Sequence, residues 1–142
     1  MIPAAARTDT RGNDVTEPHQ GAGPVVIPAE QLRLPGGRTL RFEGKDHGSG
    51  VSFFLVISNP GEGPALHRHP YTETWSVLEG EATIRMGDQE VVARVGDTTV
   101  VPPDTWHAFT NSGDGDLRMI CIHASPLMLQ DDHPAPRADR RV

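Results

Sequence analysis

The sequence contains a single cysteine, Cys121, so no disulfide can form within the chain, and the cysteine count gives no indication of the compartment. Long hydrophobic runs are also missing: none approaches the roughly 20 residues that a membrane-spanning helix needs. Residues 1–12 lack the apolar core of a secretory signal. We therefore expect a soluble, cytoplasmic protein that has no membrane partner.

Positive charge is scarce as well. The chain has 13 lysines and arginines against 19 aspartates and glutamates, which gives a formal net charge of −6. It has no basic stripe, no lysine patch interleaved with aromatic residues, and no helix-turn-helix pattern. These absences argue against a nucleic-acid partner and against a sensory domain of a transcription factor.

Long helical patterns are absent, and only Ala29–Leu34 is compatible with a short helical turn. Instead, 15 glycines and 13 prolines divide the sequence into short runs rich in β-branched and aromatic residues. Such runs, separated by turn-forming residues every eight to twelve positions or so, predict an all-β sandwich or barrel. The expected strands are Val25–Ile27, Thr39–Phe42, Val51–Ile57, Thr74–Leu78, Ala82–Met86, Gln89–Arg94, Thr98–Val101, His107–Asn111 and Leu117–His123.

The length of 142 residues predicts one domain, and no internal repeat suggests a second barrel. Residues 1–24 show no hydrophobic periodicity, so we expect a flexible N-terminal arm. We expect the β-barrel to occupy residues 25–130. Residues 131–142, which contain two prolines and a basic end, are expected to form a frayed tail.

Histidines and a glutamate gather in one short stretch. His67 and His69 are separated by one residue, Glu73 follows four positions later, and His107 lies 40 residues after His67. On an extended segment both rings of a His-x-His pair point to the same side, because side chains alternate along a strand. Imidazole suits zinc, copper, iron and nickel, and a carboxylate also admits manganese. These four residues are therefore candidate ligands for one divalent ion of Fe, Mn, Ni, Cu or Zn.

The alternative interpretation is a surface pair of histidines beside a solvated glutamate. Seven histidines in 142 residues make a chance His-x-His pair common. The added glutamate at a fixed offset makes the full pattern much rarer, which favours the metal site.

The spacing of this stretch resembles the first motif of the cupin superfamily, in particular of its small single-domain bacterial members. That motif is a glycine, five residues, His-x-His, three or four residues, a glutamate, six residues and a glycine. Every fixed position is met, by Gly61, His67, His69, Glu73 and Gly80.

A second stretch resembles the second cupin motif, in which a glycine, a proline, a glycine, a histidine and an asparagine stand at fixed spacing. Gly96, Pro102, His107 and Asn111 match it, and Asp104 stands where the second glycine is usual. A turn with positive φ is expected there, which aspartate tolerates better than most residues. We therefore interpret this departure as mild.

The resemblance implies a cupin-type double-stranded β-helix, or jelly-roll barrel, that holds the metal inside one end. The implied ligands are His67, His69, Glu73 and His107. Four protein ligands leave open positions on an ion that prefers six, unlike a closed structural zinc site. Glu73 is a candidate catalytic base as well as a ligand.

Alternation from these ligands places further side chains near the site. For each of them, the alternative interpretation is a place in the barrel core. We expect Trp75 and Phe109 on the ligand side, and Tyr71 in the turn between ligands. In Leu117–His123 the odd positions share a face. If that face is interior, Met119 and Cys121 line a substrate pocket and His123 can act as a proton shuttle. The opposite register would put Ile120 and Ile122 inside.

The fold alone does not determine the chemistry. The leading hypothesis is a metal-dependent enzyme with dioxygenase-like chemistry on an enol, diketone or carboxylate that chelates the ion. Non-redox Lewis-acid catalysis by a lyase, isomerase or cyclase is the second. A small-ligand binding protein without catalysis is the third. A homodimer is expected from the two-sided apolar runs.

Overall fold

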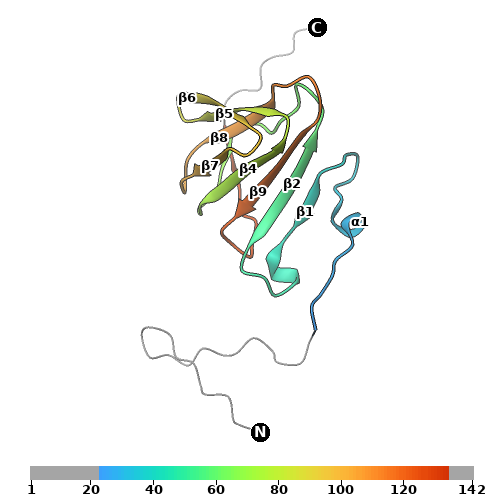
Figure 1. The fold of residues 1–142 in the computed structure, drawn as a ribbon. Coiled ribbons are helices and arrows are strands. Elements are labelled where there is room, and N and C mark those ends of the chain that lie inside the picture. Colours follow the sequence, from blue (N-terminus) through green and yellow to red (C-terminus); the bar gives the residue numbers. More distant parts are fainter. Residues whose placement is uncertain (1–22, 135–142) are drawn as a thin grey trace, which may run out of the picture.

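The computed structural model describes residues 23–134, which form two five-stranded antiparallel sheets (Figure 1). The first sheet has the order β1 (Leu40–Phe42), β2 (Ser52–Ser58), β9 (Leu117–His123), β4 (Glu73–Glu79) and β7 (Thr98–Val101). The second has the order β10 (Asp131–Asp132), β3 (His67–Arg68), β8 (His107–Asn111), β5 (Glu81–Met86) and β6 (Gln89–Arg94). Helix is limited to α1 (Ala29–Leu32) and a 3₁₀ turn at Gly44–Asp46. The all-β jelly-roll expected from the sequence is confirmed.

Most strands lie where the hydrophobic pattern places them, within one or two residues. The prediction of a strand at Val25–Ile27 is wrong, because within residues 23–134 this segment pairs with no strand, and its two valines are 73% and 84% exposed. Pro24 and Pro28 flank it, which leaves few backbone N–H groups for a ladder.

The barrel core comes from alternate residues on strands of both sheets. Along β9 the odd positions are buried, from Leu117 through Met119 and Cys121 to His123. This settles the register that the sequence left open, with His123 inside. The core is completed mainly by Val56, Trp75, Val77, Ala82, Ile84, Ala93, Val101 and Phe109.

The C-terminal part of the described chain corrects one boundary. Residues from 131 were expected to fray, but Asp131 and Asp132 form β10 and pair with Arg68 and His67 of β3. The rest of the expected tail, from residue 135, and nearly all of the expected N-terminal arm lie outside the described residues.

Two turns carry positive φ where the motifs require it. Asp104 has a φ of 57°, as expected from its place in the second motif, and its N–H donates to the carbonyl of His69 at 2.8 Å. Gly80 has a φ of 83°, and a Cβ there would lie 2.4 Å from the carbonyl oxygen of Asp116. Both turns therefore fix how the strands around the site meet. Within residues 23–134 no helix is long and apolar enough to cross a membrane.

Candidate metal centre

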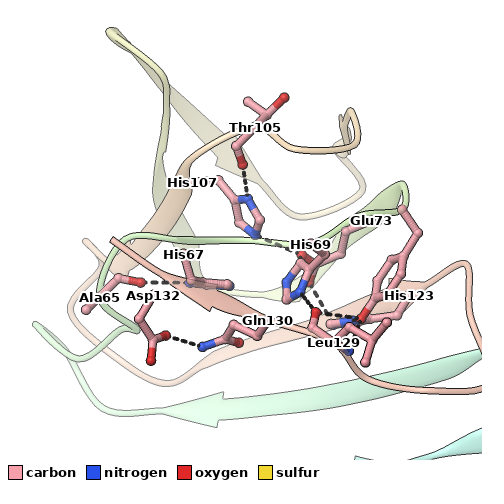
Figure 2. A network of polar contacts seen from close by, with 11 residues as sticks. Ala65, His67, His69, Glu73, Thr105, His107, His123, Leu129, Gln130 and Asp132 are labelled. Atoms are coloured by element: carbon pink, nitrogen blue, oxygen red, sulfur yellow. Dashed lines mark hydrogen bonds and ion pairs between the residues drawn. The ribbon is translucent and has the colours of Figure 1, made fainter. Parts of the chain in front are cut away.

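The two sheets bring four candidate ligands to one point inside the barrel (Figure 2). His67 lies on β3 and pairs directly with His107 on β8. Glu73 is the first residue of β4, in the facing sheet, and His69 lies in the connection between β3 and β4. One ligand atom from each residue lies within 4.8 Å of the others, and all four side chains are buried.

Backbone carbonyls fix the orientation of the three imidazoles. The Nδ1 atoms of His67 and His107 lie 2.7 Å from the carbonyl oxygens of Ala65 and Thr105. Nδ1 of His69 lies 2.6 Å from the carbonyl oxygen of Leu129. A carbonyl only accepts, so each Nδ1 carries a proton, and Nε2 is the ring atom left for a metal.

The Nε2 atoms converge on one carboxylate. Glu73 Oε2 lies 3.0 Å from Nε2 of His107 and 3.2 Å from Nε2 of His69. These three atoms are buried, and none has a hydrogen bond of good geometry among the described residues. Buried polar atoms without such a bond are rare, because each costs free energy. The donor set and its unsatisfied atoms thus fit a divalent ion.

The electrostatics keep the carboxylate ionised. Burial by itself would raise the pKa of Glu73, but the contacts with His107, His123 and His69 outweigh it and lower that pKa strongly. Burial lowers the pKa of His67, which favours its neutral form. An anionic glutamate and a neutral imidazole are the states in which these side chains bind a metal.

A fourth histidine adjoins the cluster without belonging to the set of ligand atoms. Nε2 of His123 lies 3.2 Å from Glu73 Oε1, the oxygen that faces away from His69 and His107. Its Nδ1 lies 2.7 Å from the hydroxyl of Tyr71. That hydroxyl also accepts from the N–H of Leu129 at 3.1 Å. A line of polar contacts thus runs from the backbone through Tyr71 and His123 to Glu73.

A cavity of about 510 Å³ reaches this cluster. His67, His69, Glu73 and His123 line its inner end. Its other lining residues come mainly from β2 and from the segments at 34–39 and 59–64, with Phe109, Cys121 and Gln130 completing it. A small molecule that enters this cavity can therefore reach the candidate ligands.

The comparisons agree with this geometry. A sequence model of the Cupin domain family matches residues 54–123, a segment that contains both histidine motifs. The chain is a cupin.

Three known proteins illustrate the range of its relatives. Mannose-1-phosphate guanylyltransferase RfbM of Salmonella typhimurium is 31% identical over 61% of this cupin and 18% of its own length. Protein SchB of Streptomyces halstedii is 33% identical over 60% of this cupin and 56% of its own length. A variant of the oxalate decarboxylase OxdC of Bacillus subtilis superposes with a TM-score of 0.63 at 21% identity, over 71% of this cupin and 29% of that chain. This cupin spans about half of SchB and less of the other two proteins. The superposition on OxdC, at 21% identity, shows the fold alone.

The structure separates the side chains that were expected near the site. Phe109 and Cys121 line the cavity of this cupin. Trp75 and Met119 instead belong to the hydrophobic core, where both are almost fully buried. Tyr71 contacts His123 through its hydroxyl. Burial raises the pKa of the Cys121 thiol, so it stays protonated.

Other residues of the site carry no signal in the sequence. Leu129 acts only through its backbone, which binds both His69 and Tyr71, and a backbone contact is independent of side-chain type. Phe54 and Val56 line the cavity from β2, but the uniformly apolar run around them gave no indication of which face is interior. Pocket-lining residues at 34–39 lie outside both cupin motifs.

Proposed function

We propose that this cupin is a metal-dependent enzyme that acts on a small molecule with an oxygen-chelating group, such as an enol, a diketone or a carboxylate. One observation carries the proposal. Three imidazoles with fixed Nδ1 partners and one ionised glutamate meet at the inner end of an accessible cavity, and none of the ligands is a cysteine.

His67, His69, Glu73 and His107 would hold the ion. A divalent ion bound there supplies a Lewis acid with positions left open for substrate oxygens. Nδ1 of His69 and Nδ1 of His107 are held by hydrogen bonds to the backbone carbonyls of Leu129 and Thr105, which keeps the ligand geometry rigid.

His123 favours an enzyme over a plain binding protein. A binding site needs the ligands and a shaped cavity, whereas turnover also needs a group that moves a proton. His123 lines the cavity, touches Glu73 at 3.2 Å and is oriented by Tyr71 at 2.7 Å. These contacts support a role in holding and transferring a proton beside the bound substrate, with Glu73 as its partner.

Dioxygenase-like chemistry is our first proposal for the reaction class, since the His₃Glu donor set suits iron, manganese, nickel or copper. Non-redox catalysis by a lyase, isomerase or cyclase is the second. His123 favours the second class specifically, because such reactions are proton transfers and need a base in reach of the substrate.

The test starts with metal analysis by plasma mass spectrometry of protein purified without a metal column or chelator. The loaded protein is then given a panel of enediols, diketones and carboxylates in an oxygen electrode. Substrate-dependent oxygen uptake supports the oxygenase, and product formation that continues under argon supports the non-redox enzyme. Shifts in melting temperature without any product would indicate a binding protein. Protein that binds none of Fe, Mn, Ni, Cu and Zn would overturn the proposal.

The homodimer and the cytoplasmic location stay predictions. Exposed apolar side chains on β6 and β7, among them Val91, Val92 and Val100, offer area that a second copy can cover. Light scattering on the purified protein measures the oligomeric state directly.

A further inference from the structure

The cavity follows β2, which lines it from Phe54 to Ser58. Ser52 of β2 pairs with His123 at the metal end of the barrel, and Ser58 pairs with Leu117 at the other end. Six residues of strand at about 3.3 Å each separate the two levels by roughly 20 Å. The cavity lining includes Phe54, Val56 and Ser58 along this path. The space therefore reaches well beyond the molecule's metal-chelating end.

The middle of the cavity is apolar. Phe54 stands on β2 of the first sheet and Phe109 on β8 of the second, so two aromatic rings line the space from facing sheets. Val56, Leu34 and Pro64 add further apolar surface. Apolar walls favour a ligand whose central part is hydrophobic, and aromatic rings in particular bind flat groups well.

The end far from the candidate ligands is polar, but it is not positive. Arg38 lines it and donates to both oxygens of Asp116 at 2.7 and 2.9 Å, and to the side chain of Asn59 at 2.9 Å. Glu62 lines the same end and accepts from Asn59. One cation beside two anions gives no net attraction for a second negative group on a ligand.

We propose, on the basis of the metal-dependent function above, that the substrate is elongated, with a chelating head, a flat aryl-sized apolar body and a neutral polar tail. The head meets the cluster of His67, His69, Glu73 and His107. The body lies between Phe54 and Phe109. The tail meets the polar lining residues Arg38, Asn59 and Glu62. A volume of about 510 Å³ falls within the roughly 300–1,000 Å³ of pockets for drug-sized ligands, which is far more than a two-carbon dicarboxylate fills.

The experiment uses full-length protein loaded with Zn²⁺, a redox-inert ion, and measures binding by isothermal titration calorimetry. Three probes share one β-diketone head: acetylacetone has no body, benzoylacetone adds a phenyl ring, and 4-carboxybenzoylacetone adds a distal anion. We expect benzoylacetone to bind at least about tenfold more tightly than acetylacetone. The carboxylated probe should bind several-fold more weakly than benzoylacetone. Oxalate serves as the small-dianion comparison and should bind more weakly than any aryl probe.

Variants locate the effect in the cavity. Phe54→Ala should remove most of the advantage of the phenyl ring while leaving acetylacetone binding and zinc content unchanged. Val100→Ala, on the exposed outer side of β7, is the matched control and should change neither. The zinc content and the melting temperature of each variant show whether it has folded. If Phe54→Ala does not fold, Phe109→Leu replaces it as a milder reduction of the apolar wall.

The outcomes separate this inference from the proposed function. If acetylacetone and benzoylacetone bind equally, or if the carboxylated probe or oxalate binds best, the substrate class is wrong while the metal-dependent function stands. If no probe binds to protein that holds stoichiometric zinc, chelation at the metal fails and the proposed function fails with it.

Discussion

The hydroxyl of Tyr71 lies 2.7 Å from Nδ1 of His123, across 52 residues of sequence. The Leu129 N–H donates to that hydroxyl at 3.1 Å, and the hydroxyl can donate its own proton either to the Leu129 carbonyl at 3.3 Å or to Nδ1 of His123. On the other side of the ring, Nε2 of His123 lies 3.2 Å from Glu73 Oε1. Tyr71 thus connects His123, which contributes none of the four clustered ligand atoms, to the backbone of Leu129.

Removing the Tyr71 hydroxyl should reduce stability without removing the metal. Tyr71→Phe leaves Nδ1 of His123 and the N–H of Leu129 without their partner, which costs about 1–3 kcal/mol of unfolding free energy. Urea denaturation of the metal-free protein measures the loss, and plasma mass spectrometry measures the metal content. A variant as stable as the natural protein would show that the hydroxyl contributes nothing in solution.

His123 should behave as a proton-transfer group and not as a ligand. His123→Ala should keep near-stoichiometric metal, because the four ligand atoms lie on other residues. Turnover of a substrate identified by the panel should fall by about 10²–10⁴-fold, the usual contribution of general acid–base catalysis. Loss of the metal in this variant would instead make His123 a fifth ligand.

The three ligand histidines should be essential for metal binding. His69→Ala or His107→Ala should weaken metal affinity strongly. The loss should exceed the ~10–100-fold that follows when only a hydrogen-bond partner of a ligand is removed. Competition with a chromophoric chelator gives the affinity. His47→Ala is the matched control, since His47 is exposed and outside the cluster. Equal affinity in all three proteins would contradict the ligand assignment.

The segment that ends in β10 should support metal binding although it contributes no ligand. A chain that ends after Met128 loses the carbonyl that holds Nδ1 of His69, and it loses the pairing of β10 with β3. Metal affinity should fall about 10–100-fold. A chain that ends after Pro134 keeps both contacts and should bind as the full chain does. If the two truncations bind equally, Leu129 does not orient the ligand.

Asp104 should tolerate glycine but not a β-branched residue. With φ at 57°, Asp104→Val should cost at least about 1–2 kcal/mol, because a side chain branched at Cβ is strained in this conformation. Asp104→Gly should fold without such a loss. Thermal denaturation of the two variants side by side gives the comparison, and a stable valine variant would exclude strain at this turn.

The cluster of candidate ligands could be predicted from sequence because the two motifs fix its spacing, although His69 lies in the connection after β3 and not on a strand. Side-chain alternation offered two registers for β9, and only packing chose the one that buries His123. Leu129 and β10 could not be predicted, since a two-residue strand has no pattern and a carbonyl has no residue signature. Trp75 was expected in the pocket because it shares the face of Glu73; its ring packs against His107 and Phe109 in the hydrophobic core, and it is not among the residues that line the cavity.

The contact between Nδ1 of His69 and the carbonyl of Leu129 also constrains how the protein is made. The two residues are 60 positions apart, and Leu129 is translated after all four ligands have left the ribosome's catalytic centre. Any orientation of His69 by this carbonyl therefore has to wait until synthesis of the chain has passed Leu129.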